Sequence, residues 1–298
     1  MQTMSHELKR IYPFRSRAVS VNGFSMHYID EGSGPVVLCL HGNPTWSFYY
    51  RHVVQTLSPM YRVLVPDHIG MGLSDKPHPE DHEHSLMQRV RDTETFLDAV
   101  APEEPVHLIV HDWGGMIGTL LALRRPERIK SFVITNTAGF LQPAEKQLPL
   151  RIRLARDVRP LAVPAILGMN LFSKCALLFC SVRKLSSTVQ EGYLFPYRRP
   201  VHRRAQLAFV QDIPLTPGDR SYEAVAWAEK NLSILTPLPK IILWGEKDFV
   251  FDTDYRDRWQ HCFPDAACHS FPNAGHYLFE DERERCMILL RAFLEQKN

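Results

Sequence analysis

Short apolar runs alternate with helical patterns along the first 140 residues of the chain. Four runs have the length and continuous hydrophobicity of buried parallel strands: Val36–His41, Arg62–Pro66, Val106–His111 and Ile129–Thr135. Helical spacing occurs between them, at Trp46–Leu57, Leu86–Val100 and Trp113–Leu123. Because a connection between parallel strands is usually a helix, this order predicts a mostly parallel sheet flanked by helices on both faces.

The alternation stops after Phe140 and resumes near Ser221, so the middle of the chain is an insertion. Beyond it we expect a strand at Lys240–Trp244, a helix at Thr253–Cys262, a strand at Cys268–Phe271 and a final helix at Asp281–Gln296. A strong turn signal at Asn22-Gly23 also predicts a hairpin of Val19–Val21 with Met26–Asp30. The expected organisation is an α/β core of residues 1–140 and 220–298 with a helical cap of residues 141–219.

Charge is distributed unevenly between the core and the cap. The whole chain has 35 Lys and Arg against 33 Asp and Glu, a net charge of +2 that gives no reason to expect nucleic acid as a partner. Pro143–Asp219 holds 12 basic and 5 acidic residues, so this segment carries +7 and the remainder −5. A cap that is basic outside and apolar inside fits this composition. The basic residues are either a solvated face or a surface for an anionic substrate, an acidic partner or a membrane.

Composition also limits the class of protein. A chain with 45% hydrophobic and 23% charged residues is neither disordered nor fibrous. Its six cysteines show no metal-ligand spacing, and its first residues show no signal-peptide pattern, so we expect reduced thiols, no metal site and a cytoplasmic location. The longest apolar region, Leu161–Val182, is interrupted by Pro164 and Lys174, which disfavours a spanning helix. It is a candidate for an interfacial segment or for the lining of a pocket.

An aspartate stands where a predicted strand turns into a helix. Val110-His111-Asp112-Trp113-Gly114-Gly115 has the pattern of a nucleophile elbow, a sharp turn that exposes its central side chain above the sheet. A carboxylate there is suited to displace a leaving group from a saturated carbon, with an alkyl ester as the intermediate. The alternative is an aspartate that only caps the following helix. Asp112 is our candidate nucleophile.

Two later residues complete the chain order of nucleophile, acid and histidine. His276, in the loop Asn273-Ala274-Gly275-His276-Tyr277 after the last strand, is the candidate base. Asp248 follows the preceding strand and would hold the imidazole tautomer and stabilise its positive charge. A capping role for Asp248, or its replacement by Glu246, is the alternative.

Two hydrogen-bond donors accompany the nucleophile. Asn43 lies in His41-Gly42-Asn43-Pro44, a loop that normally supplies a backbone N–H to an oxyanion hole, and it adds a side-chain amide. Trp113 adds an indole N–H, which donates and does not accept. Donors beside a carboxylate suit a departing anion, either a halide or the carboxylate of an opened ring. Packing for Trp113 and a turn for Asn43 are the structural alternatives.

These segments, taken in order, resemble a known group of enzymes. HGNPTWSFYYR, PDHIGMGLSDKP, HDWGG, WGEKDF and NAGHY are similar to the haloalkane dehalogenases and to the β-lactone decarboxylases of bacterial long-chain olefin biosynthesis. The resemblance covers both halves of the core and implies an α/β-hydrolase fold. It also implies that Asp112 is the nucleophile, with His276 as base and Asp248 as acid, that Asn43 and Trp113 stabilise the leaving group, and that no cofactor is needed.

The segments PTWSFYYR and VPDHIGMGLSDKP favour the decarboxylase. We expect a carbon–carbon lyase that converts a hydrophobic cis-3-alkyl-4-alkyl β-lactone (oxetan-2-one) into a long-chain cis-alkene and CO2, in association with other olefin-biosynthesis proteins or peripherally with a membrane surface. The first alternative is a haloalkane dehalogenase, which hydrolyses haloalkanes to alcohol and halide. The second is an epoxide hydrolase, with Tyr193 and Tyr197 available as ring-opening acids in the cap, or a non-catalytic binding protein on the same fold.

Overall fold

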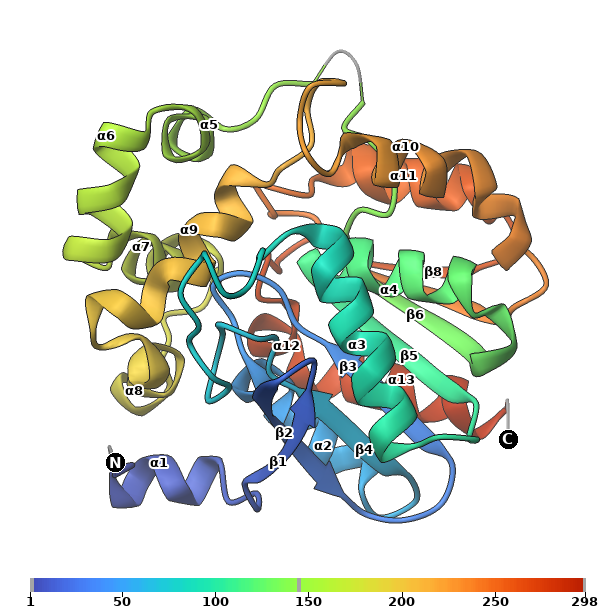
Figure 1. The fold of residues 1–298 in the computed structure, drawn as a ribbon. Helices are drawn as coiled ribbons and strands as arrows, with labels where there is room; N and C mark the ends of the chain where they lie inside the picture. Colours follow the sequence, from blue (N-terminus) through green and yellow to red (C-terminus); the bar gives the residue numbers. More distant parts are fainter. Residues whose placement is uncertain (1–2, 144–145, 297–298) are drawn as a thin grey trace.

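In the computed structural model, which describes residues 3–143 and 146–296, an eight-stranded sheet forms the centre of the chain (Figure 1). The strand order is β1-β2-β4-β3-β5-β6-β7-β8. The strands are β1 Arg17–Val21, β2 Phe24–Glu31, β3 Val36–Leu40, β4 Arg62–Pro66, β5 Val106–Asp112, β6 Ile129–Thr137, β7 Lys240–Gly245 and β8 Ala267–Phe271. From β4 to β8 every neighbouring pair is parallel, whereas β2 runs antiparallel to both β1 and β4.

Burial explains the sequence pattern of the strands. Every residue of β3 and of β5 is buried, because helices cover both faces of the sheet there, so β3 is a continuous apolar run and β5 is apolar except at His107, His111 and Asp112. The β1–β2 hairpin turns through Asn22 and Gly23, whose φ angles of 49° and 88° are the left-handed values that such a turn requires. The predicted hairpin and the mostly parallel sheet are confirmed.

Helices of the core cover the sheet in two groups. Helix α4 contacts both α3 and α10, and α2 contacts α13 (Figure 1). The helices and short helical turns of the core are α1 His6–Ile11, η1 Ser47–Tyr50, α2 Arg51–Leu57, α3 Leu86–Val100, α4 Trp113–Arg124, η2 Pro126–Arg128, α10 Tyr222–Asn231, η6 Leu232–Leu235, α11 Thr253–Cys262, α12 Leu278–Asp281 and α13 Arg283–Glu295.

The segment between β6 and α10 is helical and lies to one side of the sheet (Figure 1). Its elements are α5 Leu150–Asp157, α6 Arg159–Ala162, the π-helical turn η3 Val163–Gly168, α7 Leu171–Phe179, α8 Ser187–Leu194, η4 Phe195–Tyr197, η5 Pro200–Arg203 and α9 Arg204–Gln211. Of these, α8 contacts the N-terminal helix α1, and Ser5 of the core donates a hydrogen bond of 2.9 Å to Glu191 of α8. The sequence analysis did not predict α1 or its contact with α8.

Two predicted helices begin differently in the structure. Trp46–Leu57 is a 3-10 turn followed by α2, and the helix predicted at Asp281–Gln296 is α13, which begins only at Arg283 because Asp281 ends the separate short helix α12. The second difference has a visible cause, because the carboxylate of Asp281 turns towards the cap and accepts hydrogen bonds from Ser181 Oγ at 2.6 Å and from Gly275 N at 2.8 Å. Glu282 then leaves the helical conformation, with φ −126° and ψ 40°.

Candidate active site

Strand β5 turns sharply into helix α4 at Asp112. This residue has φ 53° and ψ −130°, a conformation that is uncommon for a residue with a Cβ atom. Glycines make room for it: a Cβ atom on Gly42 would lie 1.9 Å from Asp112 Oδ1, and one on Gly114 would lie 1.9 Å from the Leu40 carbonyl oxygen. The Asp112 side chain makes no capping hydrogen bond to α4, so capping does not explain the aspartate.

The two carboxylate oxygens of Asp112 have different surroundings. Oδ1 accepts a hydrogen bond of 2.6 Å from the backbone N–H of Asn43, and Oδ2 lies 3.4 Å from Nε2 of His276. Burial alone would raise the pKa of this carboxyl, but the hydrogen bond and charge of His276 outweigh it and lower the pKa of Asp112. Asp112 is therefore an anion with one oxygen held by the backbone and the other next to the histidine.

His276 lies between two carboxylates. Its Nδ1 is 2.7 Å from Asp248 Oδ2, and Asp248 also accepts hydrogen bonds from Asn136 Nδ2 at 3.0 Å and from Val250 N at 2.7 Å. Burial would lower the pKa of the imidazole, but the charge of Asp248 and hydrogen bonds to both aspartates outweigh it and raise the pKa of His276 to about 10. At neutral pH the ring is an imidazolium.

The carboxylate that contacts His276 belongs to Asp248, in the loop after β7, and not to the neighbouring Glu246. Glu246 pairs with Arg256 at 2.9 Å instead of turning to the histidine. Asn136 of β6 holds the loop in place, since its amide donates to Asp248 Oδ2 and to the Gly245 carbonyl and accepts from Gly245 N at 2.8 Å. Asn136 is a positioning residue that sequence reasoning missed.

The two predicted donors both line the cavity beside Asp112. The side-chain amide of Asn43 donates to the Gln206 carbonyl oxygen of cap helix α9 at 3.1 Å, so one of its two N–H bonds is already used. Among the described residues, none accepts a hydrogen bond from the indole N–H of Trp113. The Trp113 ring packs edge-on against Phe209, with ring centroids 5.2 Å apart. One donor is thus tied to the cap, and the other is free for a substrate.

A cavity of about 270 Å³ adjoins the Asp112 carboxylate and is largely apolar. Its walls come from the cap elements α5, η3 and α7, from the segment 213–215 after α9, and from the loop 249–251 after β7. Ile166, Phe172 and Ala176 are among the lining residues, so part of the apolar region Leu161–Val182 does line a pocket. The contributions of α5 and of the loop after β7 were not predicted from the sequence.

The described residues contain neither a cluster of metal-ligating side chains nor a single membrane-spanning helix. Within residues 3–143 and 146–296, no group of three or more His, Cys, Asp or Glu side chains is arranged to hold a metal ion. No single described helix is long and apolar enough to cross a bilayer, although Arg159–Gly168 and Leu171–Phe179, bent by 80°, pass that test together by length and composition.

A model of the α/β-hydrolase fold matches residues 35–283. The chain belongs to the α/β-hydrolase family. It is 41% identical over 97% of its length to a cis-3-alkyl-4-alkyloxetan-2-one decarboxylase of Shewanella oneidensis, covering 91% of that protein. It is 39% identical over 96% of its length to an enzyme of the same name from Xanthomonas campestris, covering 97% of it. The crystal structure of an ancestral haloalkane dehalogenase superposes with a TM-score of 0.82 at 29% identity, over 94% of this chain and 98% of that one.

Within this α/β-hydrolase, the two cap tyrosines that an epoxide hydrolase would need are not in the cavity. The hydroxyl of Tyr193 donates to Glu280 at 2.5 Å, and that of Tyr197 donates to the Thr45 carbonyl at 3.1 Å and accepts from Gly72 N at 3.0 Å. Neither lines the cavity beside Asp112. These contacts remove the structural basis for the epoxide hydrolase alternative.

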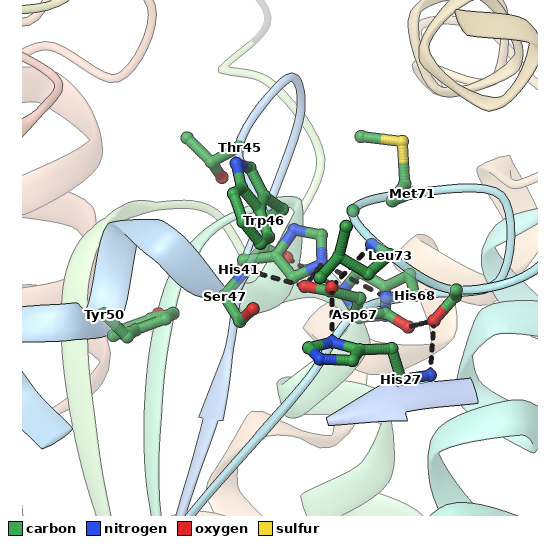
Figure 2. Close-up of polar contacts among 12 residues, drawn as sticks. His27, His41, Thr45, Trp46, Ser47, Tyr50, Asp67, His68, Met71 and Leu73 are labelled. Carbon is green, nitrogen blue, oxygen red and sulfur yellow. Dashed lines mark hydrogen bonds and ion pairs between the residues drawn. The ribbon is translucent and has the colours of Figure 1, made fainter. Parts of the chain in front are cut away.

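A buried aspartate supports the loop that carries Asn43. Asp67 Oδ2 lies 2.8 Å from His27 Nδ1, and its carboxylate accepts from Ser47 N at 2.7 Å and from Leu73 N at 2.8 Å (Figure 2). Burial would raise its pKa, but the charge and hydrogen bond of His27 outweigh it and lower the pKa of Asp67 to about 2. Asp67 therefore fixes the backbone at Ser47, just after the segment His41–Thr45 that we call the oxyanion loop. The sequence analysis did not predict this role.

Proposed function

We propose that this α/β-hydrolase converts cis-3-alkyl-4-alkyl β-lactones into cis-alkenes and CO2, as a carbon–carbon lyase. The observation that carries the proposal is an aspartate at the elbow, ionised at the edge of an apolar cavity, in a chain that is 41% and 39% identical to two proteins named as decarboxylases of such lactones. The named haloalkane dehalogenase is more distant, at 29% identity.

In the first step, Asp112 Oδ2 attacks the saturated ring carbon that is bonded to the ring oxygen, not the carbonyl carbon, and does so from the face opposite that oxygen. A C–O bond to Asp112 forms and the ring C–O bond breaks. The electron pair of the broken bond stays on the ring oxygen, which becomes part of a free carboxylate. The product of this step is an alkyl ester on Asp112 that carries a carboxylate on the neighbouring carbon.

In the second step, the bond between that carboxylate and its carbon breaks. Its electron pair forms the carbon–carbon double bond, and Asp112 departs with the electrons of the ester bond. The products are CO2, the alkene and the original Asp112 carboxylate, so the two steps together need no proton, water or redox partner. Attack from the opposite face places the ester oxygen anti to the departing carboxylate, and an anti elimination then leaves both alkyl groups on the same side, as they were in the cis lactone.

His276 acts in this scheme as a fixed positive charge. The imidazolium lies 3.4 Å from Asp112 Oδ2 and is held by Asp248 at 2.7 Å. A preorganised cation lowers the energy of a carboxylate that forms beside it. When Asp112 leaves the adduct as a carboxylate, His276 therefore stabilises the leaving group, which gives the histidine a role in a reaction that uses no water.

Trp113 and Asn43 serve the other carboxylate, the one that the opening ring releases. The indole N–H of Trp113 and the remaining amide N–H of Asn43 are donors beside the cavity. Their hydrogen bonds would strengthen as charge develops on the ring oxygen. The loss of one such donor costs on the order of 2–4 kcal/mol of transition-state stabilisation in an oxyanion hole.

The second candidate function, haloalkane hydrolysis, rests on the same nucleophile and donors and on the likeness to a dehalogenase structure. The two reactions differ after the adduct has formed, because a halide-derived ester has no carboxylate to lose and requires water activated by a neutral histidine.

Incubation with a synthetic cis β-lactone and, separately, with a bromoalkane of matched chain length tests the proposal. We expect cis-alkene from the lactone, at a rate far above that of bromide release. Saturable bromide release without alkene from any lactone would make the chain a dehalogenase, and recovery of the β-hydroxy acid would make it a lactone hydrolase.

A further inference from the structure

Exposed apolar side chains concentrate on one part of the cap. Among the described residues, twelve large hydrophobic side chains are exposed, and eight of them lie between Leu150 and Val182. The most exposed are Leu150, Leu161, Met169, Leu178 and Phe179. We call the surface of α5, α6, η3 and α7 that carries them the cap patch. Soluble surfaces rarely gather apolar side chains in this way unless something binds there.

The elements of the cap patch adjoin one another. Helix α6 contacts both α5 and η3, and η3 contacts α7, and the group lies at one side of the molecule, away from α3 and α13 (Figure 1). The Arg151 guanidinium of α5 lies 4.4 Å from the Phe179 ring centroid at the end of α7. The exposed side chains therefore belong to one surface and not to scattered positions.

Basic residues accompany the cap patch. Residues 150–184 contain seven Lys and Arg and a single acidic residue, Asp157, a net charge of +6. Within the described residues, Arg159 and Lys174, both exposed, have no carboxylate partner. Apolar side chains interspersed with unpaired basic ones are the composition of helices that lie in the interface of an anionic membrane.

The cavity opens onto this same surface. Arg151, Leu171 and Phe179 are exposed and also line the cavity beside Asp112. Arg151 lies between Phe179 and Phe249, 4.4 Å and 4.2 Å from their ring centroids, and so joins the rim of the cap to the loop after Asp248. If the cap patch rested on another surface, a molecule could pass from that surface through the cavity to Asp112 without crossing bulk water.

We propose that the cap patch docks on the surface of an anionic lipid bilayer and takes its water-insoluble substrate directly from that bilayer. The charge of the segment complements an anionic headgroup layer, and the exposed Leu and Phe side chains supply the apolar face that such helices bury at the headgroup boundary. The bent pair Arg159–Gly168 and Leu171–Phe179 has the hydrophobicity of a membrane segment without the length of a single span. The identity of the substrate rests on the proposed function, whereas the docking does not.

Co-sedimentation with vesicles tests the docking. The probes are vesicles of phosphatidylcholine alone and of phosphatidylcholine with phosphatidylglycerol, at low and high salt. We expect the wild-type protein to bind the anionic vesicles and to bind them less at high salt, because exposed charges interact over only about 10 Å at 0.1 M ionic strength. Failure to bind anionic vesicles at low salt would overturn the proposal.

A matched pair of variants locates the surface. Leu178 on the cap patch is 70% exposed and Ile288 on α13 is 69% exposed, and neither lines the cavity. Leu178→Glu should weaken vesicle binding by roughly tenfold or more, because it replaces a buried apolar contact with a charge that anionic lipid repels, and Leu150→Glu should do the same. Ile288→Glu should bind like the wild type. Equal binding by all variants, or an equal loss in Ile288→Glu, would contradict the proposal.

Two further readouts separate the remaining explanations. Asp112→Asn should bind vesicles like the wild type, so a failure of the proposed lactone chemistry leaves the docking result intact. Without lipid, sedimentation velocity should show the same oligomeric state for the wild type and for Leu178→Glu. If the wild type self-associates, Leu178→Glu abolishes that association and no vesicles are bound, the cap patch binds a second copy of the chain and the lipid proposal is overturned.

Discussion

Asp112 has one oxygen fixed by a backbone N–H at 2.6 Å and the other beside an imidazolium. Asp112→Asn keeps the shape of this side chain and removes its nucleophilicity. We expect lactone turnover to fall by roughly four orders of magnitude or more, as for the loss of other nucleophiles, while urea unfolding remains cooperative. The control is Asp265→Asn, at an exposed carboxylate, which should keep full activity. Undiminished alkene formation by Asp112→Asn, with the amide intact by mass spectrometry, would rule out this nucleophile.

The charge of His276 makes a prediction about pH. Its pKa is raised in the folded protein from 6.5 to about 10, so its contribution to stability is fully present below pH 6.5 and is lost as the pH rises through about 10. The difference in unfolding free energy between wild type and His276→Gln should therefore shrink over that interval. In an NMR titration, Asp112→Asn should lower the pKa of His276, because it removes a charge and a hydrogen bond. An imidazole that titrates near 6.5 in the wild type would contradict this description of the site.

His276→Ala separates the two candidate reactions. With a bromoalkane, a dehalogenase lacking the base should accumulate the alkyl ester on Asp112, visible as added mass on the intact protein. With a lactone, loss of the imidazolium should slow the departure of Asp112, so we expect slower alkene formation, and any ester that accumulates should decay to alkene. Decay of the lactone adduct to the β-hydroxy acid in place of the alkene would contradict the reaction without water.

The candidate catalytic residues could be selected from the sequence because each stands in a short motif. Asp112, His276 and Asp248 each follow a strand, and the sheet brings the ends of parallel strands together. Asn136 and Asp67 could not be predicted in this way. Their roles depend on hydrogen bonds to Asp248 and to Ser47, far away in the chain, and an Asn at the end of a strand or an Asp just after one has no pattern that specifies such partners.

At the scale of elements, the elbow depends on how closely the oxyanion loop approaches β5. A Cβ atom on Gly42 would lie 1.9 Å from Asp112 Oδ1, whereas one on Gly218 would have no heavy atom within 4 Å. Gly42→Ala should destabilise the protein by about 1–3 kcal/mol and displace the nucleophile, so that alkene formation drops sharply. Gly218→Ala should change stability by no more than about 0.5 kcal/mol. Chemical denaturation and product assays measure both, and equal behaviour of the two variants would contradict the steric argument.

The elements that periodicity predicted best are those that local sequence controls. The bounds of α3 and α11 agree with the predicted Leu86–Val100 and Thr253–Cys262, and Ser85 and Asp252 cap these helices with their side chains. The cap was predicted only as a helical insertion. Its short helices are set by tertiary contacts such as Arg203, which donates to the Ile166 and Tyr197 carbonyl oxygens, and periodicity does not contain that information.

In the whole molecule, a buried ion pair joins the cap to the core. Arg89 of α3 lies 3.1 Å from Asp212 after α9, with side chains 1% and 5% exposed, and its guanidinium lies 3.5 Å from the Phe209 ring centroid. Asp212→Ala leaves a buried charge without its partner and should cost about 3–5 kcal/mol in urea unfolding. Glu83→Ala, at an exposed partner of Arg91, should cost less than about 1 kcal/mol. Similar losses of unfolding free energy in both variants would contradict the conclusion that the Arg89–Asp212 pair joins the cap to the core.

The fold class and the presence of a cap followed from the order of strand and helix patterns. The strand order did not, because β4 lies between β2 and β3 and no local signal specifies that neighbour. The cavity also could not be predicted in detail. It exists only where α5, α7 and the loop after β7 meet, and no local pattern in these segments specifies that meeting.

The central claim is that Asp112 opens the lactone and leaves without water. A single turnover of a cis β-lactone in heavy-oxygen water, followed by mass spectrometry of the peptide that contains Asp112, tests it most directly. The account predicts cis-alkene as the product and an Asp112 carboxylate without the heavy isotope, because no water attacks the ester. Incorporation of heavy oxygen into Asp112 together with release of the β-hydroxy acid would contradict it.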